Sequence, residues 1–461
     1  MEGTMTLKER SIANQEEDKK RFLFKNRMVE QDVAKGLMIF AVMFVHCVPL
    51  TKLADTILRA ILGMVIPFFF FISGFNYKKP DVLPINRKER INLYLKRVKK
   101  RCRQILVPLA FCSLILLGIG CLMALVSKGS DPVITPLDMV KAFAGFWISE
   151  PLSSKVFNFP SFAANPSTYV GIERLFEPNW FILHMVLAYI IFYAVVDWAL
   201  SNKKSYASVL FALIVVSCGL NWLCFKFNFK LPWGLENAAA YASIMLMGCG
   251  VKKKKLFEES RYTKKYWPWV NCVCCLAICV GLGFLWPRAG QISGSGQICK
   301  VFYSISPEFA ILEIPFTLIY SIIASYYLIW VCKLLVIVRP IKFYFSYLGR
   351  NSLMILVFHL VFVGIAKTIV GADVNASLEF VEQVDWRNLL AFLLTVLMVT
   401  LLITINVMCK WQYRKAKRIR KLLKIKYTEL SEDNLLTKEA KAVRLKEYKL
   451  ELKKTLIAKE C

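Results

Sequence analysis

The chain has 461 residues, of which 57% are hydrophobic and 20% charged, and its formal net charge is +29 at pH 7. A soluble globular domain carries about a quarter of its residues as charged types, so this composition argues against one. The positive charge could suit a nucleic-acid partner, but the Lys and Arg residues stand in dense blocks between apolar runs, as in the cytoplasmic loops of membrane proteins. We therefore expect a membrane protein that binds no nucleic acid.

Ten apolar runs of about 20 residues follow one another along the chain, and each is long enough to cross a hydrocarbon core of roughly 30 Å. Lipid offers backbone groups no hydrogen-bond partner, so each crossing run must be helical. The predicted spans are approximately 33–50, 58–77, 104–126, 178–200, 207–226, 233–250, 268–287, 308–332, 343–366 and 388–410. The predicted fold class is all-α, a polytopic membrane helical bundle of about ten transmembrane helices.

Basic blocks follow every second span, and this alternation sets the expected orientation. Seven Lys and Arg residues lie between Lys8 and Arg27, eleven lie in the connection after the second span, and further blocks follow the sixth and tenth spans. Because basic residues accumulate on the cytoplasmic side of a membrane, an even number of spans with both termini cytoplasmic accounts for the pattern.

The predicted organisation has three parts: a cytoplasmic N-terminal segment 1–32, a transmembrane domain 33–410 and a basic cytoplasmic tail 411–461. Leu and Tyr recur at helical spacing in the tail, which favours a basic amphipathic helix on the membrane surface. Within the domain, 127–177 is predicted as a long extracytoplasmic loop rich in proline and aromatic residues. Long loops are uncommon unless they are functional or disordered, and both an acceptor-binding lid and a structural cap remain open.

Most of the 15 cysteines lie inside apolar runs, where a thiol packs as a small hydrophobic group. Cys272 and Cys275 form an isolated CxxC pair with no second pair and no nearby histidine. A structural metal site needs about four ligands at recognisable spacing. We therefore expect no metal.

The chain has three histidines, His46, His184 and His359, and all of them fall in predicted spans. Ionisable residues within a membrane are costly and usually face the bundle interior or a polar cavity. A single histidine of this kind is often only a packing residue, whereas three of three favour a functional cavity.

The first span combines Asp32, Lys35 and His46. Lys35 and His46 are eleven residues apart, almost three helical turns, so their side chains point the same way about 16 Å apart. Asp32 lies three residues before Lys35 and can pair with it on that face. An imidazole can take a proton from a sugar hydroxyl near neutral pH, which makes His46 a candidate base. The alternative for Lys35 is an interfacial lysine that snorkels to the membrane surface.

Three further signals are weaker. Ser73 and the glycine after it form a small pair near the inner end of the second span, where another helix or a ligand could approach closely. His184 lies one turn after Trp180 on the same helix face, and Ser352 lies seven residues before His359, again on a shared face. A helix cap by Asn351 or Ser352 is the plain alternative there.

A basic cluster runs from Lys96 to Arg103 before the third span. It fits a cytoplasmic topology signal, and it also fits a phosphate site, because guanidinium groups bind phosphate bidentately. Arg97, Arg101 and Arg103 are the candidate phosphate ligands.

Taken in order, these motifs resemble the acyltransferase 3 family of bacterial integral-membrane acyltransferases. The resemblance rests on Asp32-x-x-Lys35-Gly36 with His46, on Phe70-Phe71-Ile72-Ser73-Gly74-Phe75, on the basic run into Leu106-Val107-Pro108, on Asn179-Trp180-Phe181, and on Leu348-Gly349-Arg350-Asn351-Ser352 with His359. Family members similarly have about ten spans with cytoplasmic termini. The motifs extend from residue 27 to about 365 and so cover most of the chain.

The resemblance implies an enzyme of the cell (inner) membrane that moves an acyl group, usually acetyl, to a hydroxyl of a cell-envelope carbohydrate or lipid-linked glycan. Its implied partners are membrane lipid, a carbohydrate or glycolipid acceptor, and acetyl-CoA or another acyl-CoA as the cytoplasmic donor. His46 would be the catalytic base and Lys35, which stands where many relatives have arginine, would orient the donor. The catalytic candidates are Asp32, Lys35, His46 and His359; the donor-binding candidates are Lys35, Ser73, Arg97, Arg101 and Arg103; the acceptor-binding candidates are Trp180, His184 and Ser352.

Two other classes of protein compete with this interpretation. A transporter or flippase for an envelope glycan would also use intramembrane histidines and a cavity, but it predicts internal repeats, which the sequence does not show. A scaffold whose polar residues only fix helix packing predicts that all three histidines tolerate replacement by glutamine.

Overall fold

A computed structural model of the chain describes most of the predicted spans. The described residues are 28–49, 65–80, 84, 86–126, 136–148, 180–227, 231–258, 266–285, 312–372, 384–432, 437, 440 and 442–448. Throughout these residues the secondary structure is helical, without strands. The predicted all-α class is therefore confirmed.

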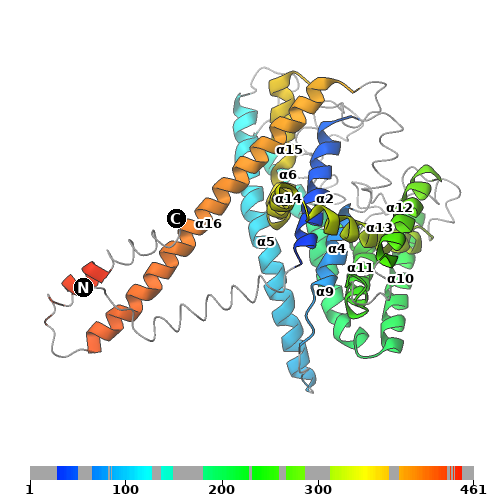
Figure 1. Cartoon of the computed structure of the whole chain (residues 1–461), viewed down its shortest axis with the longest axis horizontal. Helices are drawn as coiled ribbons and strands as arrows, with labels where there is room; N and C mark the ends of the chain where they lie inside the picture. Colours follow the sequence, from blue (N-terminus) through cyan, green and yellow to red (C-terminus); the bar gives the residue numbers. More distant parts are fainter. Residues whose placement is uncertain are drawn as a thin grey trace. The chain divides into compact units, whose positions relative to one another are not determined.

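The helices follow the predicted spans closely (Figure 1). In chain order they are α2 (Val29–Cys47), α4 (Val65–Phe75), α5 (Arg87–Val126), α6 (Pro136–Ile148), α9 (Trp180–Ala199), α10 (Lys203–Lys226), the 3-10 helix η2 (Pro232–Gly234), α11 (Leu235–Lys253), α12 (Trp267–Leu285), α13 (Glu313–Leu335), α14 (Arg339–Arg350), α15 (Ser352–Val370) and α16 (Trp386–Glu432). Among the described residues, six helices are long and apolar enough to cross a membrane, namely α5, α9, α10, α13, α15 and α16. Ten spans stay a prediction.

The structure differs from the predicted elements in four places. The third span does not begin at 104, because α5 already begins at Arg87 and includes much of the basic connection. The predicted span 343–366 is two helices, α14 and α15, because the backbone of Asn351 leaves the helical region with φ −111° and ψ 14°. The last span does not end at 410 but continues as α16 to Glu432. The predicted loop 127–177 contains α6; its remaining residues, and with them the choice between lid and cap, lie outside the described part.

The chain divides into two compact units, one of residues 29–399 and one of residues 1–28 with 400–461. The first unit holds every described residue of the predicted site. The second contains the later part of α16 and a described stretch at 442–448 that is also helical. Its basic composition agrees with the predicted tail, but its place on a membrane surface stays a prediction.

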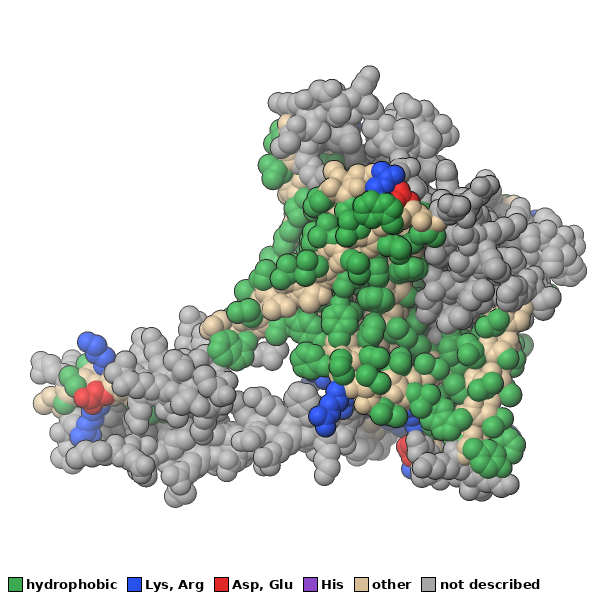
Figure 2. All heavy atoms as spheres, turned by 45° about the horizontal axis from the view of Figure 1, so that its top comes forward, with side chains coloured by type: hydrophobic (Ala, Val, Ile, Leu, Met, Phe, Trp, Pro, Cys, Tyr) green, Lys and Arg blue, Asp and Glu red, His purple; other side chains and the backbone are tan. Residues whose placement is uncertain are grey.

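Hydrophobic side chains face outward over much of the described helices. Figure 2 shows one such face, covered by hydrophobic side chains with Lys and Arg near the helix ends. Phe111 on α5, Phe211 on α10 and Leu393 on α16 are all exposed. A soluble monomer rarely exposes a continuous apolar surface of this kind, whereas lipid solvates it. The first unit is therefore a polytopic membrane bundle.

Helix α2 lies at the centre of this bundle, and its residues supply the core. In Figure 1 it stands beside α14 and α15, and it also contacts α13 and α4. Many of its apolar side chains are fully buried, among them Val33, Met38, Ile39 and Met43. A helix that carries Glu30, Asp32, Lys35 and His46 is thus surrounded by other helices rather than by lipid.

Candidate functional site

An ion cluster forms at the first turns of α2. The Asp32 carboxylate is only 2% exposed, and its Oδ1 accepts from Lys35 Nζ at 2.9 Å. Its Oδ2 accepts from Arg350 Nε, the last residue of α14, at 3.3 Å. A buried carboxylate needs such partners, because an unpaired buried charge is strongly destabilising. The predicted Asp32–Lys35 pair is therefore confirmed. Arg350 is a member of the cluster to which sequence analysis gave no role, although it lies in one of the motifs that carry the family resemblance.

Two glycines bring Arg350 to Asp32. A Cβ atom added at Gly36 would lie 1.9 Å from the carbonyl oxygen of Phe345, and one added at Gly349 would lie 1.9 Å from that of Asp32. Neither position has room for a side chain, so the backbones of α2 and α14 touch at both points. The close approach fixes the position of the guanidinium relative to the carboxylate.

At the other end of α2, His46 meets His359 of α15. The two ring centroids lie 5.3 Å apart with an interplanar angle of 53°. His359 is fully buried, and its Nδ1 lies 2.9 Å from the carbonyl oxygen of Leu356. Since a carbonyl oxygen only accepts, Nδ1 carries the proton and Nε2 is the basic nitrogen of the neutral ring. Within the described part of the chain, the buried Nε2 meets no hydrogen-bond partner.

The histidine pair has polar neighbours that sequence reasoning missed. The Cys47 thiol, next to His46, donates to the hydroxyl of Thr395 at 3.6 Å. Lys367, in the last turn of α15, is fully buried and interacts electrostatically with Cys47. An ionisable side chain buried within a membrane bundle is a functional candidate by default. No motif marked Lys367, because its environment exists only once α2, α15 and α16 are packed.

The arginines of α5 have local partners. Arg97 Nη1 pairs with Asp197 Oδ2 of α9 at 2.6 Å and donates to the Tyr77 hydroxyl at 3.2 Å. Tyr77 in turn donates to Asp197 Oδ1 at 2.5 Å; burial and this nearby carboxylate raise the pKa of Tyr77. The Arg101 guanidinium lies 4.8 Å from the ring centre of Tyr189. These contacts tie α5 to α9, which is a structural role.

Other predicted donor ligands are less engaged with the site. Arg103 is exposed on α5. The Ser73 hydroxyl donates to the carbonyl oxygen of Phe69 at 2.7 Å within its own helix. A Cβ at Gly74 would lie 1.8 Å from the carbonyl oxygen of Met245. The small Ser73–Gly74 pair of α4 therefore lets the backbone of α11 pack closely against it. Whether any of these residues binds a donor stays a prediction.

The predicted acceptor residues do not all join the histidine pair. His184 of α9 is buried and packs edge-on against Tyr241 of α11, with ring centroids 5.8 Å apart. A Cβ at Gly234 would lie 1.7 Å from His184 Nε2, so η2 closes directly over the imidazole. The side chain of Trp180 lies outside the described part.

Ser352 is the first residue of α15, so the N-cap position belongs to Asn351. Asn351, the residue before it, makes no side-chain cap hydrogen bond; its amide instead donates to the carbonyl oxygen of Tyr347 at 2.9 Å. Ser352 itself is half-buried. An acceptor role for Ser352 stays a prediction.

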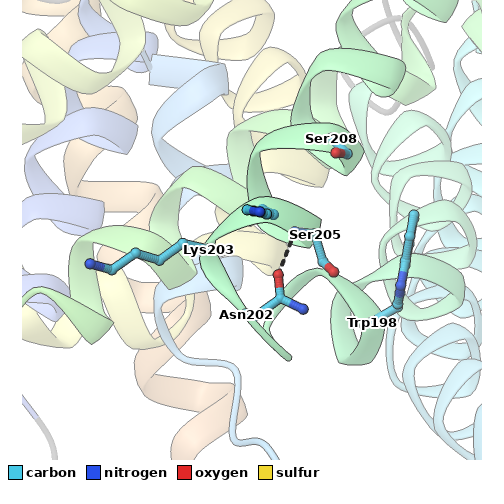
Figure 3. Close-up of a pocket in the computed structure, with 6 residues that line it drawn as sticks. Trp198, Asn202, Lys203, Ser205 and Ser208 are labelled. Carbon is cyan, nitrogen blue, oxygen red and sulfur yellow. Dashed lines mark hydrogen bonds between the residues drawn. The ribbon is translucent and has the colours of Figure 1, made fainter.

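Two cavities open within this unit. One, of about 540 Å³, lies at the turn between α9 and α10 (Figure 3). Its lining residues are Trp198, Asn202, Lys203, Lys204, Ser205 and Ser208. Asn202 caps α10 by accepting from the backbone N–H of Ser205 at 2.7 Å, as the dashed line in Figure 3 marks. The turn between the two helices and the cap of α10 are enough to explain this cavity, and neither requires a ligand.

The second cavity, of about 350 Å³, lies between the start of α2 and α14. Its lining residues are Val29, Arg339, Lys342, Phe343, Ser346, Tyr347 and Arg350. Arg350 links it directly to the ion cluster. Neither cavity is lined by a histidine, so a passage from the inner surface to His46 stays a prediction.

In the described residues, no group of three His, Cys, Asp or Glu side chains is placed to hold a metal ion. Of the cysteines of the predicted CxxC, Cys272 is buried and Cys275 half-buried, and both are free thiols.

Together the fold and the buried polar groups define a class: a polytopic helical membrane protein whose central helix carries an ion cluster at one end and half of a histidine pair at the other. A family model described as an acyltransferase domain, that of acyltransferase 3, matches residues 29–407. The match covers most of the chain, so the chain belongs to this family and is a multi-pass membrane acyltransferase. The matched region begins with α2 and includes both polar groups. No curated protein and no solved structure matches the chain.

Proposed function

We propose that the protein transfers an acyl group, most simply acetyl, from cytoplasmic acyl-CoA to a hydroxyl of a cell-envelope carbohydrate or lipid-linked glycan, in the inner cell membrane. The observation that carries the proposal is the contact of His46 with His359, since it sets two imidazoles side by side inside a membrane bundle. His359 is fully buried and His46 half-buried, and two ionisable side chains placed together within a membrane bundle are a costly arrangement for packing alone.

The chemistry needs one proton acceptor and no metal. An imidazole takes the proton of the acceptor hydroxyl, whose oxygen attacks the thioester carbonyl; a C–O bond forms, the C–S bond breaks, and the thiolate leaves and recovers the proton. His359 is oriented for this work, because its Nδ1–H bond to Leu356 fixes the ring and directs basicity to Nε2. His46 lies beside it, as either the base itself or its partner in holding the proton.

The ion cluster would serve the donor side. Asp32 holds Lys35 and Arg350 on the face of α2 that also carries His46. From Asp32 to His46 is fourteen residues, or about 21 Å of helix. A donor whose charged end lies near the cluster and whose acyl group reaches the histidines would thus lie along α2.

The test is transfer of labelled acetyl from acetyl-CoA in membranes that contain the intact chain, His46→Gln or His359→Gln. Loss of a general base costs about 100-fold or more in rate, and we expect a loss of that size for each variant. Lys204→Gln places the same new side chain in the exposed turn of α10 and serves as the control. Full transfer by both histidine variants would remove the pair from the mechanism.

A further inference from the structure

The cavity between α2 and α14 is built mainly from one face of α14. Arg339, Lys342, Ser346 and Arg350 all line it. These positions follow the spacing i, i+3, i+7 and i+11, which places them in one stripe along about 16 Å of helix. The stripe therefore presents three cations and a hydroxyl to a single cavity.

All the charged residues that line this cavity are positive. None of its lining residues is acidic, and the only acid that touches them in a described ion pair is Asp32, through Arg350 Nε. The Arg350 side chain is 41% exposed, so the guanidinium also faces the open side. Phe343 and Tyr347 add aromatic surface to the same wall. Cations beside aromatic rings are a recurrent arrangement for binding phosphorylated ligands with a planar base.

The sequence of α14 explains why the side chains of Arg339 and Lys342 are exposed. Pro340 stands in the first turn, where the missing N–H costs no hydrogen bond. Ser346, Leu348 and Gly349 are buried, and the glycine contact with Asp32 holds this face against α2. Arg339 and Lys342 are exposed. The helix is thus anchored by its small and apolar residues, while Arg339 and Lys342 stay exposed at the cavity.

We infer that this cavity binds the phosphate groups of the acyl donor, the nucleotide end of coenzyme A. The inference rests on the proposed function and deepens it by assigning the donor phosphates to α14 instead of to the arginines of α5. Arg350 joins the cavity to Asp32 and Lys35, and α2 then leads to His46. A donor held by its phosphates at α14 would extend its pantetheine arm along the helix that carries the histidine.

A lipid headgroup is the other source of a phosphate at this place, because Phe343 is 76% exposed at the rim. The ion cluster argues for the donor: Arg350 is shared between the cavity and a carboxylate that is 2% exposed. A lipid site would need no such connection to the interior.

The test uses the full chain in detergent with the double variant Arg339→Gln/Lys342→Gln. Both side chains are exposed, so their loss leaves the Asp32 cluster in place. The matched control, Lys203→Gln/Lys204→Gln, removes two cations from the other cavity. We expect the Kd for coenzyme A, measured by calorimetry, to rise about tenfold or more in the α14 variant, since each lost charge-assisted hydrogen bond weakens binding substantially. The control should retain the wild-type Kd.

Kinetics give a second measurement that a general loss of structure would not reproduce. The KM for acetyl-CoA should rise in the α14 variant with little change in kcat. Acetyl-pantetheine, a donor without the nucleotide, should be used equally by the variant and the wild type. Equal losses with both donors would overturn the inference, because the defect would not depend on phosphate.

Three further outcomes show whether the inference fails alone or together with the proposed function. If the wild type binds coenzyme A and the α14 variant binds it equally well, the phosphate site is elsewhere and the inference fails, while the proposed function stands. The inference fails in the same way if the variant binds coenzyme A normally and differs from the wild type only in how phosphatidylglycerol in vesicles changes its activity. That outcome identifies a lipid site. If the wild type binds no coenzyme A, the proposed function fails and the inference with it.

Discussion

Two basic regions of this protein, on α5 and on α14, differ in the partners of their cations. The run on α5 contains Arg97 and Arg101, and each is held by a neighbour on α9, the carboxylate of Asp197 or the ring of Tyr189. On α14, by contrast, Arg339 and Lys342 line a cavity with no acidic residue in its wall. Two arginines of the denser run are thus already engaged within the bundle, whereas Arg103 of the same run is exposed.

The comparison shows why charge density does not identify a binding site. A cation paired with a carboxylate inside the protein stabilises helix contacts, and a ligand phosphate would have to displace that partner. A cation at an open cavity has no such competitor. The decisive information is the partner of each charge, and partners far apart in the chain come together only in the fold.

The largest effect should come from Asp32→Asn, which removes the charge that holds Lys35 and Arg350. Breaking a buried ion cluster by deleting one partner costs about 3 kcal/mol, and we expect the apparent Tm in detergent to fall and acetyl transfer to be lost. Asp385→Asn removes the acid of an exposed pair with Arg387 and should leave the Tm unchanged. A Tm for Asp32→Asn equal to that of the control would mean that the cluster does not stabilise the α2–α14 contact.

Gly36→Ala should come next, since its Cβ would lie 1.9 Å from the Phe345 carbonyl oxygen. Forcing the helices apart costs about 2 kcal/mol and should displace α14, so the Tm should fall and the KM for acetyl-CoA should rise. Gly118 of α5 has nothing within 4 Å of its added Cβ. Gly118→Ala should therefore be neutral or slightly stabilising; equal losses in both variants would contradict the proposed contact.

Asp197→Asn tests the same comparison on α5 instead of α14. It removes the partner of Arg97 in a half-buried pair, and we expect a loss of about 1 to 2 kcal/mol in stability, seen as a lower Tm. Because the pair is structural, the KM for acetyl-CoA should stay at the wild-type value. A lower KM would show that the released Arg97 binds the donor, and would move the phosphate site back to α5.

The smallest effect should come from Tyr77→Phe, which deletes the hydroxyl that donates to Asp197. One hydrogen bond to a charged group contributes about 1 to 2 kcal/mol, measurable as a modest fall in Tm without a kinetic change. Tyr94 makes only a long bond of 3.4 Å to the Ile190 carbonyl, so Tyr94→Phe is the matched control. Indistinguishable Tm values would remove Tyr77 from the α5–α9 contact.

Sequence reasoning succeeded where the information is local. Helical spacing predicted that Asp32 and Lys35 pair, and the structure has them 2.9 Å apart. The predicted spans coincide with helices because a 20-residue apolar run has few alternatives in lipid. The break at Asn351 was missed, because α14 and α15 together contain enough apolar residues to look like one span.

Long-range partners could not be predicted. Arg350 lies 318 residues from Asp32, and Asp197 lies 100 residues from Arg97; nothing in either local segment specifies the other. His46 and His359 were each recognised as candidates, but their contact depends on how α2 and α15 pack. Lys367 gave no signal at all, since a lysine near the end of a span is ordinary until its burial is known.

The interlocking of Gly36 with Phe345 and of Gly349 with Asp32 has a consequence for variation of this protein. The backbone of the opposite helix occupies the position that a Cβ atom would take at each glycine. A larger residue at either glycine therefore requires that the opposite helix move away. Two stretches more than 300 residues apart must then change together or not at all. Transplanting α2 alone into a related enzyme should fail, and moving α2 with α14 as a matched pair should restore the fit.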